Sequence, residues 1–220
     1  LTELFGNYFS KEDFPFARGR YIYVNNIKVW FQRLSFIGEL GWEIYIPINK
    51  TNIIFNKIKK LELQYSLTYS GMHALDILRL EKKFLHWGHD ITSENNPFES
   101  GLTFAVNLKK SENFIGKEAL KKIKEKPLKK KLELFSLKDK FKPGEPLLLH
   151  DEPIFKHDKV VGFTTSSNFS FCYNKHICLA YINAKVKCED NLFIEVEGSR
   201  YSLHLEKNPL HDPKSVLMRS

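Results

Sequence analysis

The chain has 220 residues, of which 42% are hydrophobic and 14% aromatic, so the composition excludes a disordered protein and supports one large or two small globular domains. The net charge of +8 suits an anionic partner, but the basic residues are spread along the chain, which favours a solvated basic surface. Three cysteines without C-x-x-C spacing argue against a disulfide framework and for a reducing compartment, either a bacterial cytoplasm or a mitochondrial matrix.

Strand patterns open the chain. Residues 21–36 contain two strand-like runs joined by Asn25-Asn26, a pair that is typical of a tight hairpin turn. Residues 42–48 predict a third strand, which Pro47 ends. The first residue is Leu1 rather than methionine, and we expect the chain to be a piece of a longer protein.

Helices follow these strands. Helical spacing of apolar residues predicts an amphipathic helix around Ile54 and Ile58 and a longer helix over 71–87. The longer helix has one stripe that is apolar except for Glu81. A strand is predicted over 101–108 and a third helix over 115–126.

Pro127 ends the third helix, and the lysine-rich segment after it predicts a domain boundary, with one domain at 1–126 and another at 127–220. Beyond this boundary the pattern becomes strands only. Short strands at regular spacing predict a small antiparallel barrel. The predicted strands are 131–137, 146–150, 160–167, 177–182, 192–198 and 200–206. The fold class is therefore α+β followed by an antiparallel β-barrel.

Several kinds of site can be set aside. His86 and His89 would be neighbours on a helix beside Asp90, but no third ligand stands at a recognisable spacing, so we expect a loop-ordering role and no metal. The lysine run at 129–131 lacks the interleaved aromatic residues of a nucleic-acid platform. No apolar run reaches the length of about 18 residues that suggests a spanning helix, and no signal peptide opens the chain. We expect neither nucleic acid nor membrane as a partner.

The segment "SFIGELGWEIYIP", residues 35–47, places a carboxylate inside an apolar strand. Gly38 and Gly41 permit an irregular connection between two antiparallel strands, which would bring Phe36 near Glu43. Alternation puts Glu43 on one face of its strand and the apolar side chains on the other. The apolar face consists of Trp42, Ile44 and Ile46.

Two interpretations of Glu43 follow from its position. A carboxylate beside an aromatic ring can accept two parallel N–H donors from the edge of a flat heterocycle that stacks on the ring. Alternatively, Glu43 lies on the solvated face of an edge strand and binds nothing. The residues alone leave both interpretations open.

The stretch "RLSFIGELGWEIYIP" resembles the central motif of the aminomethyltransferase (glycine-cleavage T-protein) family, above all the branch fused to dimethylglycine and sarcosine dehydrogenases. "GMHALDILRLEKKFLHWGHDITSENNPFESGL" and "FIGKEAL" continue the match in order. "VVGFTTSSNFSF" and "ICLAYI" resemble strands of the family's C-terminal barrel, and "PLHDPKSVLMR" resembles the tail of the dehydrogenase branch. The resemblance covers nearly the whole chain.

The resemblance implies a tetrahydrofolate-binding unit, namely the distal part of a cloverleaf folate-binding domain followed by the barrel. The family's pterin-binding glutamate falls at Glu43. Its stacking ring, usually tyrosine, falls at Phe36, and an aromatic residue after the long helix falls at Trp87. We therefore expect Glu43, Phe36 and Trp87 to bind the folate cofactor.

Two departures from the family pattern matter. Leu75 stands where the glycine-cleavage branch usually carries an arginine near the folate tail, which favours the dehydrogenase branch. We expect Arg79 to be a buried structural partner of Glu81 or Asp76 rather than a ligand. The catalytic aspartate of the family lies in a first half of the folate domain that precedes this segment, and the FAD domain lies earlier still, so the catalytic residues are unknown here.

The resemblance implies that the parent enzyme oxidises an N-methylated glycine with FAD. It would then pass the iminium or methylene group to tetrahydrofolate, which could be polyglutamylated, and give 5,10-methylenetetrahydrofolate. The alternatives are a glycine-cleavage aminomethyltransferase and a non-catalytic folate-binding fragment.

Overall fold

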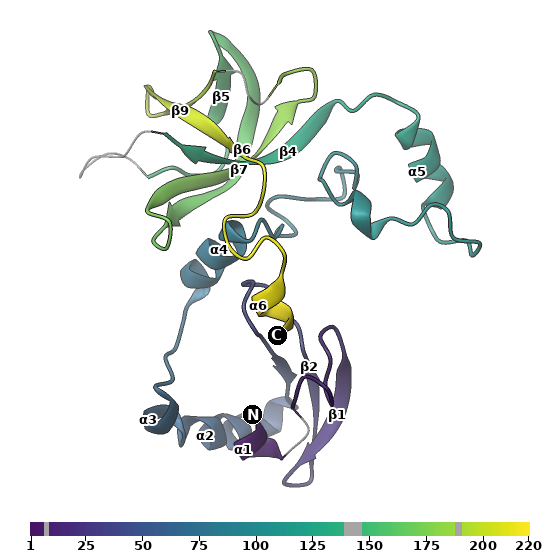
Figure 1. Cartoon of the computed structure of the whole chain (residues 1–220), viewed down its shortest axis with the longest axis vertical. Helices are drawn as coiled ribbons and strands as arrows, with labels where there is room; N and C mark the ends of the chain where they lie inside the picture. The colour runs from purple at the N-terminus through teal and green to yellow at the C-terminus, as the bar shows by residue number, and fades with distance from the viewer. Residues whose placement is uncertain (7–8, 139–146, 188–190) are drawn as a thin grey trace. The chain divides into compact units, whose positions relative to one another are not determined.

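The computed structural model describes residues 1–6, 9–138, 147–187 and 191–220. These residues form two compact units. The first unit consists of Leu1–Lys82 together with His211–Ser220, and the second unit is Lys83–Leu210. Figure 1 shows the strands and helices of each unit.

A three-stranded antiparallel sheet organises the first unit. Strands β1 (Gly19–Val24), β2 (Ile27–Gln32) and β3 (Glu43–Tyr45) pair in the order β1-β2-β3. Asn25 and Asn26 join β1 to β2 with φ angles of 49° and 62°. Asparagine tolerates this left-handed region because its short polar side chain can bond locally. The predicted tight turn is therefore confirmed, and β3 is shorter than the predicted strand.

Alternation along the strands buries one face of this sheet. The face packs on the α-helix α2 (Thr51–Lys59), whose Ile54 is fully buried. The short segments α1 (Thr2–Phe5) and η1 (Ile48–Lys50) flank the sheet in sequence. The buried residues of this core are Phe14, Val24, Ile27, Val29, Phe31 and Ile54.

The remaining helices of the first unit are α3 (Glu62–Tyr65), α4 (Met72–Glu81) and α6 (Val216–Arg219). The predicted helix over 71–87 ends six residues early, because Lys83 takes a left-handed φ of 57° that an α-helix cannot continue. None of the helices among the described residues combines the length and apolarity needed to cross a membrane.

Arg79, on α4, is almost completely buried, and its Nε and terminal nitrogen both lie 2.8 Å from Asp76 Oδ1. The contact joins residues one helical turn apart, so the guanidinium braces α4 itself. This confirms the predicted structural partnership of Arg79 with Asp76.

The second unit begins with irregular chain. The predicted strand over 101–108 is wrong, because Thr103–Ala105 form a 3-10 turn, η2. The Leu102 amide donates to the carbonyl of Pro97 at 2.8 Å, so this backbone closes on itself instead of joining a strand ladder. The predicted third helix is confirmed as α5 (Lys117–Lys124).

The rest of the second unit is a closed antiparallel barrel with the strand order β4-β7-β6-β5-β8-β9 (Figure 1). The predicted strand over 146–150 is wrong for its described residues, Leu147–His150, which belong to no strand. The pattern also missed β5, a strand of only four residues. The strands are β4 (Lys130–Leu137), β5 (Pro153–Lys156), β6 (Lys159–Ser170), β7 (Lys175–Asn183), β8 (Leu192–Val196) and β9 (Ser199–Glu206).

Side chains from the barrel strands fill its interior. Phe135, Ile154, Ile182 and Ile194 are fully buried there, as is Cys178. Burial raises the pKa of the Cys178 thiol to about 12, because the thiolate would lose its hydration inside an apolar core. Cys178 is therefore a structural core residue.

Candidate functional site

Glu43 opens β3 and lies opposite Gln32 of β2. Trp42, Ile44 and Ile46 pack against the buried core of the first unit, as the alternation predicts. Glu43 and Tyr45 lie on the opposite face of the strand. The strand thus anchors one set of side chains in the core and presents a carboxylate and a phenol on its outer face.

The Glu43 carboxylate accepts a hydrogen bond from the Tyr45 hydroxyl, with 2.6 Å between Tyr45 Oη and Glu43 Oε2. This hydrogen bond and the negative charge of Glu43 raise the pKa of Tyr45. Among the described residues, Tyr45 is the one hydrogen-bond partner of this carboxylate, so its other oxygen can accept from a ligand.

Aromatic side chains share the outer face of the sheet with this carboxylate. Trp30 of β2 lies opposite Tyr45, and its indole nitrogen donates to Gln32 Oε1 at 3.1 Å. The ring of Tyr21 on β1 meets Trp30 edge to face, with 4.9 Å between the ring centroids. Tyr21, Trp30 and Tyr45 line a shallow hollow of about 360 Å³. The sheet therefore places flat apolar surface beside a carboxylate with one oxygen available.

Sequence reasoning missed Tyr21, Trp30 and Tyr45 as lining residues. The signal was present in the hairpin: once Asn25-Asn26 fixes the turn, two-residue alternation puts Tyr21 beside Trp30 on one face. The pairing of β2 with β3 then adds Tyr45, but this register depends on a ten-residue connection that the local pattern does not specify.

Phe36 lies within the connection between β2 and β3, half-buried. Strand β2 ends at Gln32, so the strand ladder pairs Glu43 with Gln32 and not with Phe36. The expected convergence of Phe36 with Glu43 on a ligand stays a prediction.

The same connection is held in a compact form by its glycines. The Gly38 amide donates to Ser35 Oγ at 3.0 Å, and Gly38 has a φ of 84°, which favours glycine. A Cβ at Gly41 would lie 2.6 Å from the carbonyl oxygen of Leu34, so only glycine allows this close crossing of the backbone. The two glycines of the motif are thus explained by the shape of the connection, residues 33–42.

Trp87 belongs to the second unit, and its side chain is 66% exposed. It lies in a turn in which the Gly88 amide donates to the carbonyl of Ile91 at 2.8 Å. Its expected role in folate binding stays a prediction.

The Asp90 carboxylate orders this turn, and the rings of His86 and His89 lie beside it with 4.6 Å between their centroids. Asp90 Oδ2 accepts the backbone N–H of His86 at 2.8 Å, and Asp90 Oδ1 accepts the Thr165 hydroxyl at 2.6 Å. The carboxylate therefore ties the turn to β6 of the barrel. Across the described ranges, no group of three or more metal-ligating side chains is found.

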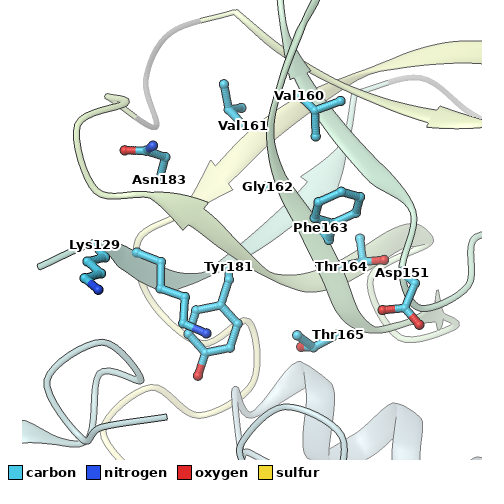
Figure 2. A pocket seen from close by; sticks show the side chains of 11 residues that line it. Lys129, Asp151, Val160, Val161, Gly162, Phe163, Thr164, Thr165, Tyr181 and Asn183 are labelled. Atoms are coloured by element: carbon cyan, nitrogen blue, oxygen red, sulfur yellow. The ribbon is translucent and has the colours of Figure 1, made fainter. Parts of the chain in front are cut away.

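A second hollow, of about 460 Å³, lies against β6 and β7 of the barrel (Figure 2). Phe163 and Tyr181 contribute rings to its lining, and Lys130 Nζ lies 4.3 Å from the centroid of the Tyr181 ring. Burial raises the pKa of Tyr181, although the hydrogen bond between its hydroxyl and Ser100, at 2.9 Å, opposes this rise. Much of the polar lining is thus already engaged within the second unit.

Comparison with known proteins identifies both parts of the chain. The profile of the GCVT N-terminal domain matches residues 1–110, and that of the glycine cleavage T-protein C-terminal barrel domain matches residues 130–212. Human mitochondrial dimethylglycine dehydrogenase is 33% identical over 96% of this chain, and the chain covers 24% of that protein. The mouse mitochondrial pyruvate dehydrogenase phosphatase regulatory subunit is 34% identical over 73% of the chain, which covers 18% of it.

Among solved structures, the glycine cleavage system aminomethyltransferase T of Bartonella henselae matches with a TM-score of 0.72 at 24% identity. The match covers 84% of this chain and 50% of that structure, and it shows the shared fold. The chain spans about a quarter or less of the length of the two curated relatives named above. The expected resemblance is confirmed, and the chain belongs to the aminomethyltransferase (glycine-cleavage T-protein) family.

Proposed function

We propose that this chain is the tetrahydrofolate-binding, one-carbon-transfer part of an FAD-dependent dimethylglycine or sarcosine dehydrogenase. The observation that carries the proposal is Glu43, which presents a carboxylate oxygen beside the aromatic hollow on the outer face of the sheet. The identity to human dimethylglycine dehydrogenase over 96% of the chain supports the choice of branch.

The residues present fit a reduced pterin. The pterin's amino group and adjacent ring N–H form two parallel donors, which a carboxylate can accept as a charge-assisted pair. Glu43 can do so with Tyr45 in place, because Oε2 keeps a second lone pair beside the one that accepts from the Tyr45 hydroxyl. We assign Glu43 to that edge and Phe36 to stacking on the ring, with Trp87 as the third contact. The aromatic side chains of Tyr21, Trp30 and Tyr45 supply further apolar surface.

Bound tetrahydrofolate would supply the two nitrogens that accept the one-carbon unit as a methylene bridge. The chain's own residues hold the pterin in one orientation and keep water from the reacting carbon, since water would release formaldehyde instead. FAD would belong to another domain of the parent protein, where the amine is oxidised.

We further propose the family's domain boundary at residues 126 and 127, because α5 ends at Lys124 and β4 begins at Lys130. The same proposal places the protein in a bacterial cytoplasm or a mitochondrial matrix, and the human relative is a mitochondrial protein by name. Polyglutamylated folate and an N-methylated glycine would be its small-molecule partners.

Glu43→Gln in the full-length protein tests the proposal. The amide keeps the size of the side chain but removes its charge and turns one acceptor into a donor. We expect tetrahydrofolate affinity, measured by calorimetry, to fall by about 1.5–3 kcal/mol, the usual range for a hydrogen bond to a charged group. The matched control is Glu62→Gln, which changes a half-buried carboxylate of the same unit that also accepts a hydrogen bond from a tyrosine hydroxyl, that of Tyr69. Equal affinities for the Glu43→Gln and control variants would remove Glu43 from the site.

A second candidate function is a non-catalytic folate-binding module, which the similarity to a phosphatase regulatory subunit favours. A third is a glycine-cleavage aminomethyltransferase, which the solved structure's similarity suggests at the level of fold. Single-turnover assays of the full-length protein separate the three. Formation of 5,10-methylenetetrahydrofolate from dimethylglycine or sarcosine supports the dehydrogenase, and formation from aminomethyl-lipoate supports the transferase. Folate binding without either product supports the module.

A further inference from the structure

Residues His211–Ser220, which we call the tail, belong to the first unit together with Leu1–Lys82, although the barrel strands precede them in sequence. The backbone N–H of His211 donates to the carbonyl of Glu81 at 3.1 Å. The tail thereby joins the end of α4, one residue before Lys82.

A buried ion pair fixes the tail at this point. Lys82 Nζ lies 3.0 Å from Asp212 Oδ2 and also donates to the carbonyl oxygen of Asp212, and the two side chains are only 2% and 7% exposed. Asp212 Oδ1 accepts the backbone N–H of Val216 at 2.8 Å, which ties the same carboxylate to the start of α6. Removal of one partner would leave a buried charge uncompensated, which is costly.

The same residues touch the connection 33–42 that carries Phe36 and leads into Glu43. A Cβ added at Gly38 would lie 2.8 Å from Lys82 Cδ, so the backbone of the connection packs directly against the aliphatic part of the Lys82 side chain. His211 Nε2 lies 2.5 Å from Glu39 Oε1, an ion pair by distance when the imidazole is protonated, although the contact does not meet hydrogen-bond geometry.

The start of the connection is held as well. Arg33 is 2% exposed, and its guanidinium donates to the carbonyl of Phe14 at 2.8 Å and to the carbonyl of Ser220. The tail therefore contacts the connection directly at Arg33 through Ser220 and at Glu39 through His211. Through Asp212 it also holds Lys82, whose side chain lies against Gly38.

We propose that Asp212 and His211 are positioning residues for folate binding: the tail holds the connection 33–42, which carries Phe36 and leads into Glu43, in one conformation. This inference rests on the proposed function, since it assumes that Phe36 and Glu43 contact the pterin. Neither tail residue needs to touch the ligand, because both act through the connection.

A double-mutant cycle in the full-length protein tests the inference. Asp212→Asn, which keeps the size of the side chain, should weaken tetrahydrofolate binding about tenfold, equivalent to about 1.4 kcal/mol. In a Phe36→Leu background the same substitution should weaken binding by less than about twofold, because the ring that the tail positions is already gone. A merely structural role would weaken binding equally in both backgrounds. Lys214→Ala, an exposed tail residue, is the matched control.

His211→Gln serves as a second variant that leaves the Lys82–Asp212 pair intact, and it should show the same dependence on Phe36 with a smaller loss. Far-UV circular dichroism of each variant checks that it is folded. Equal losses in the two backgrounds, or no loss in either while Glu43→Gln still weakens binding, would overturn the inference alone. Absence of tetrahydrofolate binding by the unsubstituted protein would overturn the proposed function first.

Discussion

The barrel and the three-stranded sheet bury the apolar faces of their strands in different ways. In the barrel, six strands close on themselves, and side chains such as Phe135 and Ile194 are fully buried inside. In the first unit, β1 and β3 flank β2 without closing, and the outer face keeps Tyr21, Tyr23 and Tyr45 more than half exposed. Closure removes strand edges, whereas an open sheet keeps a face that can meet a ligand.

Because of this difference, we expect the barrel to contribute mainly to stability and the outer face of the sheet mainly to binding. The core of the barrel is apolar, and burial there raises the pKa of the Cys178 thiol far above its ordinary value. The outer face of the sheet carries a carboxylate, a phenol and an indole in contact with solvent or with one another. We therefore expect substitutions in the barrel to change folding, and substitutions on the sheet's outer face to change ligand binding.

The largest expected difference is in the reactivity of two cysteines of the second unit. Cys178 is fully buried with a pKa of about 12, whereas Cys172 is exposed. A pKa of about 12 instead of the ordinary 9.0 reduces the thiolate fraction of Cys178 about a thousandfold. Iodoacetamide followed by peptide mass mapping should label Cys172 and leave Cys178 unmodified in the folded protein. Comparable labelling of both would mean that the barrel opens readily.

The next contrast compares stability between the two regions. Phe135→Ala should destabilise the barrel by about 3–5 kcal/mol through lost burial and the cavity left behind. Tyr23→Ala, on the open face of β1, should change stability by no more than about 0.5 kcal/mol. Hydrogen exchange of barrel and sheet amides measures both effects by region. A loss from Tyr23→Ala as large as that from Phe135→Ala would show that the outer face is packed.

The smallest expected effect is a change in the pKa of Tyr45, which depends on its hydrogen bond to Glu43. Because Glu43 accepts from the Tyr45 hydroxyl and repels the phenolate, the pKa of Tyr45 lies above its usual value. The bond is present below that pKa and is lost as the pH rises through it. Glu43→Ala should lower the pKa of Tyr45 toward that of a free tyrosine, measured by NMR titration of the ring. An unchanged pKa would show that the two side chains do not meet in solution.

The sequence predicted those features that local chemistry determines. Asn25-Asn26 specified a hairpin turn, and alternation placed Ile44 inward and Glu43 outward. The regular strand pattern after residue 130 predicted a barrel, although β5, with four residues, was too short to detect.

Features that depend on distant parts of the chain were not predictable in this way. Helix α4 ends at Glu81 because Lys83 takes a left-handed conformation. The apolar stripe of the helix does not indicate where the helix ends. The pairing of Gln32 with Glu43, and the contact of Asp212 with Lys82, join residues far apart in sequence. Such contacts depend on the tertiary fold, and only the family resemblance led us to predict Glu43 as a ligand.

If the Glu43 carboxylate holds the amino edge of a pterin, a ligand that lacks this amino group should lose the contact. Calorimetry would compare tetrahydrofolate with its 2-desamino-2-methyl analogue on the full-length protein and on Glu43→Gln. We predict that the unsubstituted protein binds the analogue at least about tenfold more weakly, and that Glu43→Gln discriminates between the two ligands by less than about twofold. Equal discrimination by both proteins would contradict the claim, because the amino group would then be recognised by something other than Glu43.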